Sequence, residues 1–212
     1  MTRGFFAVIE GPEGAGKTTL AQSLASACTA RGIDAVAVRE PGGTPAAEAI
    51  RAVLLDPDRP VLPVTELYLM LACRAELVAT VIRPALEAGK VVLADRFDLS
   101  TLAYQVAGRG LDETVVRSAN QLATGGLVPD LTVVLDVPDG LGQERQRAAG
   151  KRQDRLDREN EGFHARVNAA YLAAEGPGVR HFDGTLPPDR LFDAVWAVLM
   201  AARPETFRPR LG

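Results

Sequence analysis

A phosphate-binding loop lies near the start of this chain of 212 residues. The spacing G-x-x-x-x-G-K-T occurs in the run Gly11-Pro12-Glu13-Gly14-Ala15-Gly16-Lys17-Thr18-Thr19, between a short apolar run and a segment with helical periodicity. The glycines let the backbone curl with its N–H groups inward, at the positive end of the following helix, which favours an anion. We expect Lys17 to reach the β- and γ-phosphates of a nucleoside triphosphate and Thr18 to hold Mg²⁺. The alternative is a glycine turn that caps a helix, with Lys17 solvated.

Charged side chains directly follow two other apolar runs of strand length. Asp95 and Arg96 come after Val91–Ala94, and Arg39 ends an earlier run. We expect Asp95 to reach the Mg²⁺ of the bound nucleotide, with Asp136, which ends a similar run, as a rival or a helix cap. Arg39 and Arg96 indicate a second anion site, because the arginine fork suits a monoester phosphate. Surface ion pairs are the alternative for these two arginines.

A further cationic cluster falls in the segment from about 143 to 160. Its members are Arg145, Arg147, Lys151, Arg152, Arg155 and Arg158. Acidic residues in the same segment nearly balance them and no aromatic residue is interleaved, so the pattern does not favour a nucleic-acid site. We expect a mobile lid that closes over the transferred phosphoryl group and excludes water. The alternative is a pair of solvated helices with i,i+4 ion pairs.

Strand-like runs and helical segments alternate along the chain, and together they must position these side chains. The predicted strands are Phe5–Ile9, Ala35–Val38, Val91–Ala94, Leu131–Leu135 and Val179–Phe182. The predicted helices cover 17–31, 45–55, 64–88, 99–107, 112–125, 139–149, 158–174 and 188–202. The strands are apolar and mostly non-alternating, which is typical of a parallel sheet buried on both faces. We therefore expect an α/β three-layer fold in a single domain over 1–212, with a frayed tail after Arg203.

The composition limits the classes of function that fit. A hydrophobic content of 47% is enough for a substantial core, and a net charge of -3 provides no basic field for nucleic acid or an anionic membrane. Cys28 and Cys73 fall in apolar helical patterns, which indicates buried thiols in a reducing compartment. With only two histidines, a histidine-based metal site is not expected. No run resembles a signal peptide or a transmembrane span, so we expect a soluble, cytoplasmic protein.

An ordered set of motifs from about Phe5 to Trp196 resembles the bacterial thymidylate kinases. The set consists of the phosphate loop with Glu13 in its third position, Arg39-Glu40-Pro41-Gly42-Gly43-Thr44, Asp95-Arg96-Phe97 with Ser100-Thr101 and Ala103-Tyr104-Gln105, Pro129-Asp130-Leu131, and Asp154-Arg155 before Phe163 and Tyr171. The resemblance implies a P-loop nucleoside-monophosphate-kinase fold, with a five-stranded parallel sheet in the order 2-3-1-4-5, a short helical lid and usually a homodimer. It also implies that ATP and Mg²⁺ are used to phosphorylate dTMP to dTDP for dTTP biosynthesis.

The same resemblance implies roles for individual residues. ATP would be bound by Gly11, Pro12, Glu13, Gly14, Ala15, Gly16, Lys17, Thr18 and Thr19, and Mg²⁺ by Thr18 and Asp95. The dTMP site would comprise Glu13 at the 3′-OH, Arg39 and Arg96 at the phosphate, Tyr104 at the deoxyribose, Met70, Arg74 and Gln105 at the base, and Ser100. The catalytic set would be Lys17, Asp95, Arg96, Arg152 and Arg155.

Two positions bear on how this chain compares with the family. The family commonly has a phenylalanine that stacks on thymine where this chain has Met70, and a thioether lacks that flat surface. One branch of the family has an arginine where this chain has Gly14, so the resemblance implies that the lid supplies the cations, with Arg155 a stronger candidate than Arg152. A kinase for another nucleotide or nucleoside remains an alternative, as does a P-loop switch or regulatory ATPase. The guanine-reading N-K-x-D motif of such switches is not present.

Overall fold

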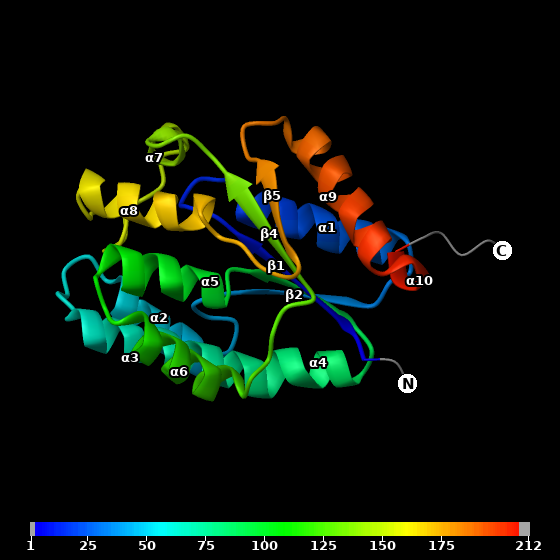
Figure 1. Ribbon diagram of the computed structural model, residues 1–212, viewed down its shortest axis with the longest axis horizontal. Coiled ribbons are helices and arrows are strands. Elements are labelled where there is room, and N and C mark those ends of the chain that lie inside the picture. The colour runs from blue at the N-terminus through cyan, green and yellow to red at the C-terminus, as the bar shows by residue number, and fades with distance from the viewer. Residues whose placement is uncertain (1–2, 208–212) are drawn as a thin grey trace.

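The core of the protein is a five-stranded sheet whose strands all run parallel, in the order β2-β3-β1-β4-β5 (Figure 1). The computed structural model describes residues 3–207. The strands are β1 (Phe5–Glu10), β2 (Ala35–Arg39), β3 (Val91–Asp95), β4 (Leu131–Asp136) and β5 (Val179–Asp183). The predicted strands and their order are confirmed. Because β1 and β2 both pair with β3, Ile9 and Arg39 each lie opposite Asp95 in the register, which brings the phosphate loop and the two predicted anion sites to one edge.

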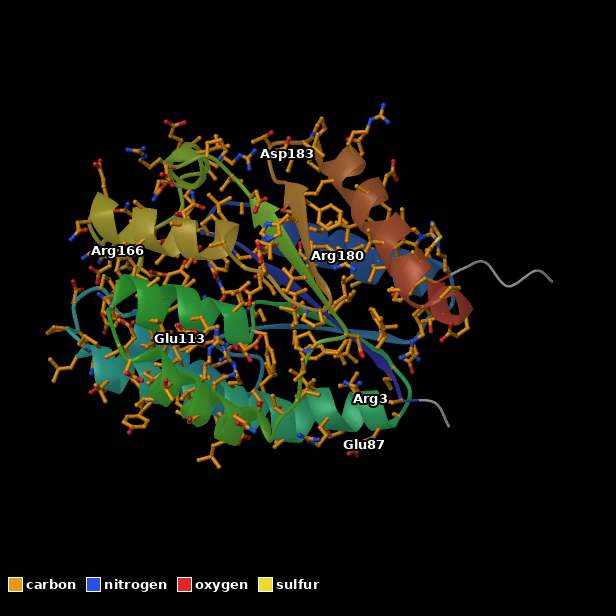
Figure 2. All side chains as sticks on the ribbon, in the orientation of Figure 1. Arg3, Glu87, Glu113, Arg166, Arg180 and Asp183 are labelled. Carbon is orange, nitrogen blue, oxygen red and sulfur yellow. The ribbon has the colours of Figure 1, made fainter. Side chains whose placement is uncertain are left out.

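Helices cover both faces of this sheet and form three layers (Figure 1). On one face, α1 (Lys17–Ala30) and α9 (Pro188–Ala202) bury the apolar side chains of β1 and β4. On the other face, the C-terminal end of α3 (Pro63–Leu77), together with α4 (Arg83–Glu87), packs on Phe6, Val8 and Val92. Charged side chains such as Glu87 and Asp183 lie at the periphery (Figure 2). The apolar pattern of β1, β3 and β4 thus reflects burial on both sides, whereas the edge strands β2 and β5 are partly exposed.

Side-chain caps set where several helices begin. The remaining helices are α2 (Pro45–Leu55), α5 (Asp98–Thr101), α6 (Glu113–Thr124), α7 (Leu141–Ala148), α8 (Glu161–Leu172) and α10 (Pro204–Phe207). Thr44, Asp112 and Asn160 accept hydrogen bonds from the backbone N–H three residues later, at the starts of α2, α6 and α8. The predicted helix over 158–174 therefore begins later than expected, since Asn160 is a cap outside it.

Two predicted helices are interrupted by wider, π-helical turns. The predicted helix over 64–88 contains η1 (Val78–Ile82), directly before Pro84, which has no N–H and would crowd the carbonyl four residues earlier in an α-helix. The predicted helix over 99–107 divides into α5 and η2 (Leu102–Gly108). Such turns often occur at functional sites, and η2 carries Tyr104 and Gln105.

The tail was only partly predicted. The frayed tail expected after Arg203 is wrong for 204–207, which form α10, because the ring of Phe207 packs against Phe5 and Trp196 in the core. Residues 208–212 lie outside the described residues. Within 3–207, no helix combines the length and the apolar character needed to cross a membrane.

Candidate active site

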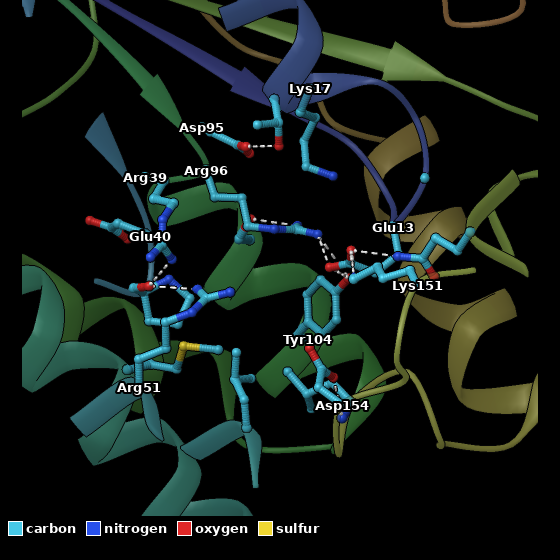
Figure 3. Close-up of a pocket in the computed structure, with 18 of the residues that line it drawn as sticks. Glu13, Lys17, Arg39, Glu40, Arg51, Asp95, Arg96, Tyr104, Lys151 and Asp154 are labelled. Atoms are coloured by element: carbon cyan, nitrogen blue, oxygen red, sulfur yellow. Dashed lines mark hydrogen bonds and ion pairs between the residues drawn. The ribbon is translucent and has the colours of Figure 1, made fainter. Parts of the chain in front are cut away.

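A cavity of about 440 Å³ opens where the phosphate loop, the ends of β2 and β3, and the segment after α7 meet (Figure 3). Most of the predicted site lines it: Glu13, Gly14, Gly16, Lys17, Thr18, Thr19, Arg39, Met70, Arg74, Asp95, Arg96, Ser100, Tyr104 and Gln105. We call this cavity the central cleft. Gly11, Pro12 and Ala15 belong to the loop but do not line the cleft, and neither do Arg152 and Arg155.

The phosphate loop holds its lysine inside the cleft. Gly16, with a φ of 98°, precedes the first turn of α1, where a residue with a Cβ would be strained. Lys17 is 6% exposed, and its Nζ donates to the carbonyl oxygen of Pro12 at 2.6 Å. Burial, followed by the nearby charge of Arg96, lowers the pKa of Lys17 to about 8. The ammonium is thus fixed among the inward-facing amides of the loop, in a site suited to phosphate.

Thr18, in the first turn of α1, meets Asp95 at the end of β3. Thr18 Oγ1 donates to Asp95 Oδ2 at 2.5 Å, so a hydroxyl and a carboxylate from two elements lie together at the mouth of the loop. Hard oxygen ligands of this kind suit Mg²⁺, which usually takes few protein ligands and completes its shell with phosphates and water. The rival Asp136, at the end of β4, instead lies 2.9 Å from His181 Nδ1, and β1 separates its strand from β3. Within 3–207, no group of three His, Cys, Asp or Glu side chains could by itself hold a metal ion.

Arg96 lies between the phosphate loop and the helical layer. Its φ of 76° is the positive value that a non-glycine residue avoids, and its backbone N–H is held by Ile9 O at 3.0 Å. Its Nη1 donates to Gly11 O at 3.2 Å and to Tyr171 Oη at 2.9 Å, while Nη2 donates to the Glu13 carboxylate. These contacts leave Nε without an acceptor among the described residues. Nη1 also donates to Ser100 Oγ at 3.2 Å and Nη2 to Tyr104 Oη at 3.3 Å. Arg96 lines the same cleft as Lys17.

Glu13 connects the loop with both Arg96 and the segment 143–160 that is predicted to be a lid. Besides its ion pair with Arg96, its carboxylate accepts from Gln146 Nε2 at 3.2 Å and lies 3.7 Å from Lys151 Nζ (Figure 3). Burial alone would raise the pKa of Glu13, but the charges of Arg96, Lys17 and Lys151 outweigh it and hold the pKa well below its ordinary value. Glu13 is thus an anion at neutral pH that joins three parts of the site.

Glu10, the last residue of β1, was not among the predicted site residues. This fully buried carboxylate accepts from the backbone N–H groups of Phe97 at 2.8 Å and Ser100 at 3.1 Å, and from Ser100 Oγ at 2.6 Å. It therefore caps α5 from another element and holds the turn that contains Arg96. Burial raises the pKa of Glu10 to about 7. An acid at the end of an otherwise apolar strand was the signal that could have revealed it.

Replacing Glu10 with glutamine should change how stability depends on pH. The folded pKa of about 7 lies above the ordinary 4.5, so between these values the folded state binds more protons and wild-type stability falls as pH rises. Glutamine does not titrate, so the unfolding free energy of Glu10→Gln, minus that of wild type, should increase by up to about 3 kcal/mol from pH 4.5 to 7.5. Urea unfolding across that range measures it. Arg96, Asp98 and Tyr171 also face this carboxylate and remain in both proteins. A difference that does not vary with pH would contradict the prediction.

Arg74, predicted to meet the base, is held by protein acceptors on every side. Its Nε and Nη2 donate to Glu40 Oε2 at 2.8 and 2.6 Å, and Nη2 also donates to Phe97 O. Its Nη1 donates to Thr101 Oγ1 and Asn120 Oδ1 at 2.6 and 2.5 Å. Since a guanidinium has five N–H donors, a base could gain a hydrogen bond from Arg74 only by taking the place of one of these acceptors.

A second buried acid, Glu66, also escaped the sequence analysis. It accepts from Gln105 Nε2 at 2.8 Å and from Arg109 Nη2 at 2.8 Å, and lies 2.8 Å from Arg155 Nη2. Its spacing on α3 was the available signal, because Glu66, Met70 and Arg74 follow one another at i, i+4 on one helix face. Glu66 thereby fixes the amide orientation of Gln105, which lines the cleft beside Met70.

The predicted cations Arg39, Arg152 and Arg155 are not equivalent in the structure. Arg39 lines the cleft and is paired with Glu48 at 3.0 Å. Arg155 is 9% exposed, is held by Glu66, and donates from Nε to Leu54 O at 2.9 Å. Arg152 lines a separate cavity beside α2. In this arrangement neither Arg152 nor Arg155 is brought together with Lys17 and Arg96.

Comparison with known proteins agrees with this geometry. The family model for thymidylate kinase matches residues 9–184. A thymidylate kinase of Thermomicrobium roseum is 50% identical over 198 residues, which cover 92% of this chain and 94% of that protein. Thymidylate kinases of Deinococcus radiodurans and Chromohalobacter salexigens are 44% and 45% identical, covering 94% and 95% of this chain and 98% and 95% of theirs. With one cleft holding both a phosphate loop and an arginine-lined anion site, and with matches over nearly its full length, this chain belongs to the thymidylate kinase family.

Proposed function

We propose that this protein transfers the γ-phosphoryl group of ATP to dTMP, forming dTDP and ADP. One observation carries the proposal: two separate anion-binding groups, the phosphate loop around Lys17 and the guanidinium of Arg96, line the same cleft. A nucleotide switch needs only the first. A kinase whose acceptor is itself a phosphate monoester needs both.

The mechanism follows from bringing two anions together. The acceptor phosphate is already ionised, so no strong general base is required, and positioning and charge neutralisation supply the catalysis. The loop amides and Lys17 would bind the donor phosphates, while Arg96, which lines the same cleft, would bind the acceptor phosphate by taking it in place of one of its present acceptors. Glu13 pairs with Arg96, and we propose that it also meets the 3′-OH of the acceptor.

We propose Mg²⁺ as the metal, held by Thr18 and Asp95 together with the phosphates of ATP. The fit rests on their oxygen donors, which lie 2.5 Å apart at the mouth of the loop. When bound, Mg²⁺ would neutralise charge on the β- and γ-phosphate oxygens. Asp95 is 8% exposed, so its carboxylate is positioned by the end of β3 before any nucleotide arrives.

Recognition of the base would involve side chains of α3 and η2. Glu66 accepts from the amide nitrogen of Gln105, which leaves the amide oxygen of Gln105 available to accept an N–H of thymine. Met70 would pack against the ring face. Tyr104, 4% exposed and beside Glu13, would pack against the deoxyribose where a 2′-OH has no room. Arg74 would mainly support the floor of this site through Glu40.

We also propose a cytoplasmic homodimer in which each chain is one catalytic domain, with a lid over about 143–160. Large apolar side chains support the dimer, because Tyr68 on α3 is 65% exposed and Leu122 on α6 is 85% exposed. These two helices pack on each other, so their outer surfaces form one side of the molecule. Light scattering coupled to gel filtration would report the mass in solution.

A coupled assay for ADP release tests the proposed activity. With ATP and Mg²⁺, we expect turnover with dTMP at least about tenfold above that with dUMP, dCMP, dGMP or AMP, since one pocket contact discriminates by roughly that factor. A reaction without acceptor measures background hydrolysis. If another nucleotide gives faster turnover, that nucleotide and not dTMP is the acceptor. If ADP release does not depend on any acceptor, the protein is a regulatory ATPase instead.

A further inference from the structure

The cations of the lid differ in what they contact, and the structure separates them. Arg155 is held by Glu66 and Leu54 O, Arg145 donates to Gly184 O at 3.0 Å, and Arg158 faces Asp58 at 3.9 Å. Arg147 and Arg152 line other cavities. Of the lid cations, only Arg145 and Lys151 line the central cleft, and Arg145 is engaged beyond β5. Lys151 is therefore the lid cation that lines the central cleft with Lys17 and Arg96 and is not engaged elsewhere in the fold.

Lys151 is loosely held in a position from which it can move. Its Nζ lies 3.7 Å from Glu13 Oε2 (Figure 3) and 3.4 Å from Asp157 Oδ2, and both distances are longer than that of a good hydrogen bond. Its side chain is 45% exposed, and it follows Gly150, whose φ of 64° is readily adopted only by glycine. An ammonium on a four-carbon stem can thus exchange these carboxylates for a more highly charged phosphate.

The phosphate loop leaves no space for a cation of its own at the facing position. Gly14 has a φ of 71°, and a Cβ built on it would lie 2.1 Å from the carbonyl oxygen of Gly142 on α7. A Cβ on Gly142 would likewise lie 1.8 Å from Glu13 O. The backbones of the loop and of α7 are therefore in direct contact. The loop therefore has no side chain at this position, and Lys151, which follows α7, supplies an ammonium to the same cleft.

We propose that Lys151 is the catalytic cation of the lid and that its ammonium contacts the phosphoryl group in transfer. This inference rests on the proposed function. In the step, the bond between the γ-phosphorus and the β–γ bridging oxygen breaks, and a bond from an oxygen of the acceptor phosphate to the γ-phosphorus forms. Lys151 leaves Glu13 and Asp157, donates to the non-bridging oxygens of the γ-phosphoryl group, and neither gains nor loses a proton. It stabilises the charge that spreads over those oxygens.

The experiment compares Lys151→Met with Arg158→Met, a matched loss of one positive charge on the same segment. Turnover of ATP and dTMP gives kcat and both KM values. We expect Lys151→Met to lower kcat about a hundredfold with KM for dTMP within threefold, because the contact is made in the transition state. Arg158→Met should stay within threefold of wild type. Lys151→Arg should recover most of the loss, which a purely structural role would not predict.

A second measurement distinguishes the possible failures. Binding of ADP with aluminium fluoride and dTMP, an analogue of the transferring group, should weaken at least tenfold in Lys151→Met, while binding of ADP alone should not change. If wild type does not phosphorylate dTMP, the proposed function fails. If wild type does, but Lys151→Met keeps kcat within threefold or Arg152→Met shows the loss instead, only the assignment of Lys151 is overturned.

Discussion

Replacing Lys17 with methionine is expected to lower kcat by at least about a thousandfold while leaving the protein folded. Lys17 is buried in the loop, and it is the donor-side cation that contacts no carboxylate directly, bonding instead to Pro12 O. Burial lowers the pKa of Lys17 to about 8, so its charge is costly to the free protein and becomes favourable when a phosphate is bound. Loss of the ammonium should therefore affect catalysis far more than folding.

Steady-state kinetics with ATP and dTMP, together with thermal unfolding, test this expectation. The melting temperature of Lys17→Met should lie within a few degrees of wild type, since the curvature of the loop depends on its glycines. A kcat within tenfold of wild type would show that the loop lysine is not part of the reaction. A protein that fails to fold would show that Lys17 has a structural role instead.

Replacing Arg96 with methionine is expected to lower kcat/KM for dTMP by about a thousandfold or more, with KM for ATP changed less than fivefold. Arg96 lines the cleft and pairs with Glu13, and we propose that its guanidinium binds the acceptor phosphate. Arg96→Lys should recover part of the activity, because it restores the charge but not the fork. The decisive comparison is between the change in kcat/KM for dTMP and the change in KM for ATP.

Stability must be measured alongside, because the loss of Arg96 leaves the Glu13 carboxylate buried without its main partner. Arg117→Met provides a matched control, since Arg117 lies exposed on α6 and is paired with Glu113 one turn away. It should retain full activity. An equal loss of efficiency for ATP and dTMP in Arg96→Met would assign Arg96 to the donor side and contradict the two-site arrangement.

The features that could be predicted from the sequence are those set by local patterns. Apolar runs buried on both faces identified the strands of the sheet, and the spacing around Lys17 identified the loop. Once the strands were placed, the meeting of Thr18 with Asp95 followed, because residues at the ends of neighbouring parallel strands share one edge.

The features that could not be predicted depend on contacts between distant elements. Glu10 and Glu66 act through partners 90 and 43 residues away, and the local signals, an acid that ends an apolar strand and an i, i+4 spacing, do not identify those partners. Arg155 is a similar case. Its side chain is held by α2 and α3, and the sequence around it does not indicate these contacts. Which buried charges pair depends on packing, so the sequence could not predict which lid arginines are bound by other parts of the protein.

The contact between Gly14 and Gly142 has a consequence for how such an enzyme can change over time. Each glycine excludes a side chain from the other's position, so a cation in the loop and a lid helix seated on the loop are alternative solutions. A side chain at Gly14 would push α7 away from the loop. The segment after α7, which carries Lys151, would then move away from the cleft. A change from a cation in the lid to a cation in the loop therefore requires α7 to shift together with the substitution at Gly14. The substitution alone is expected to lower activity.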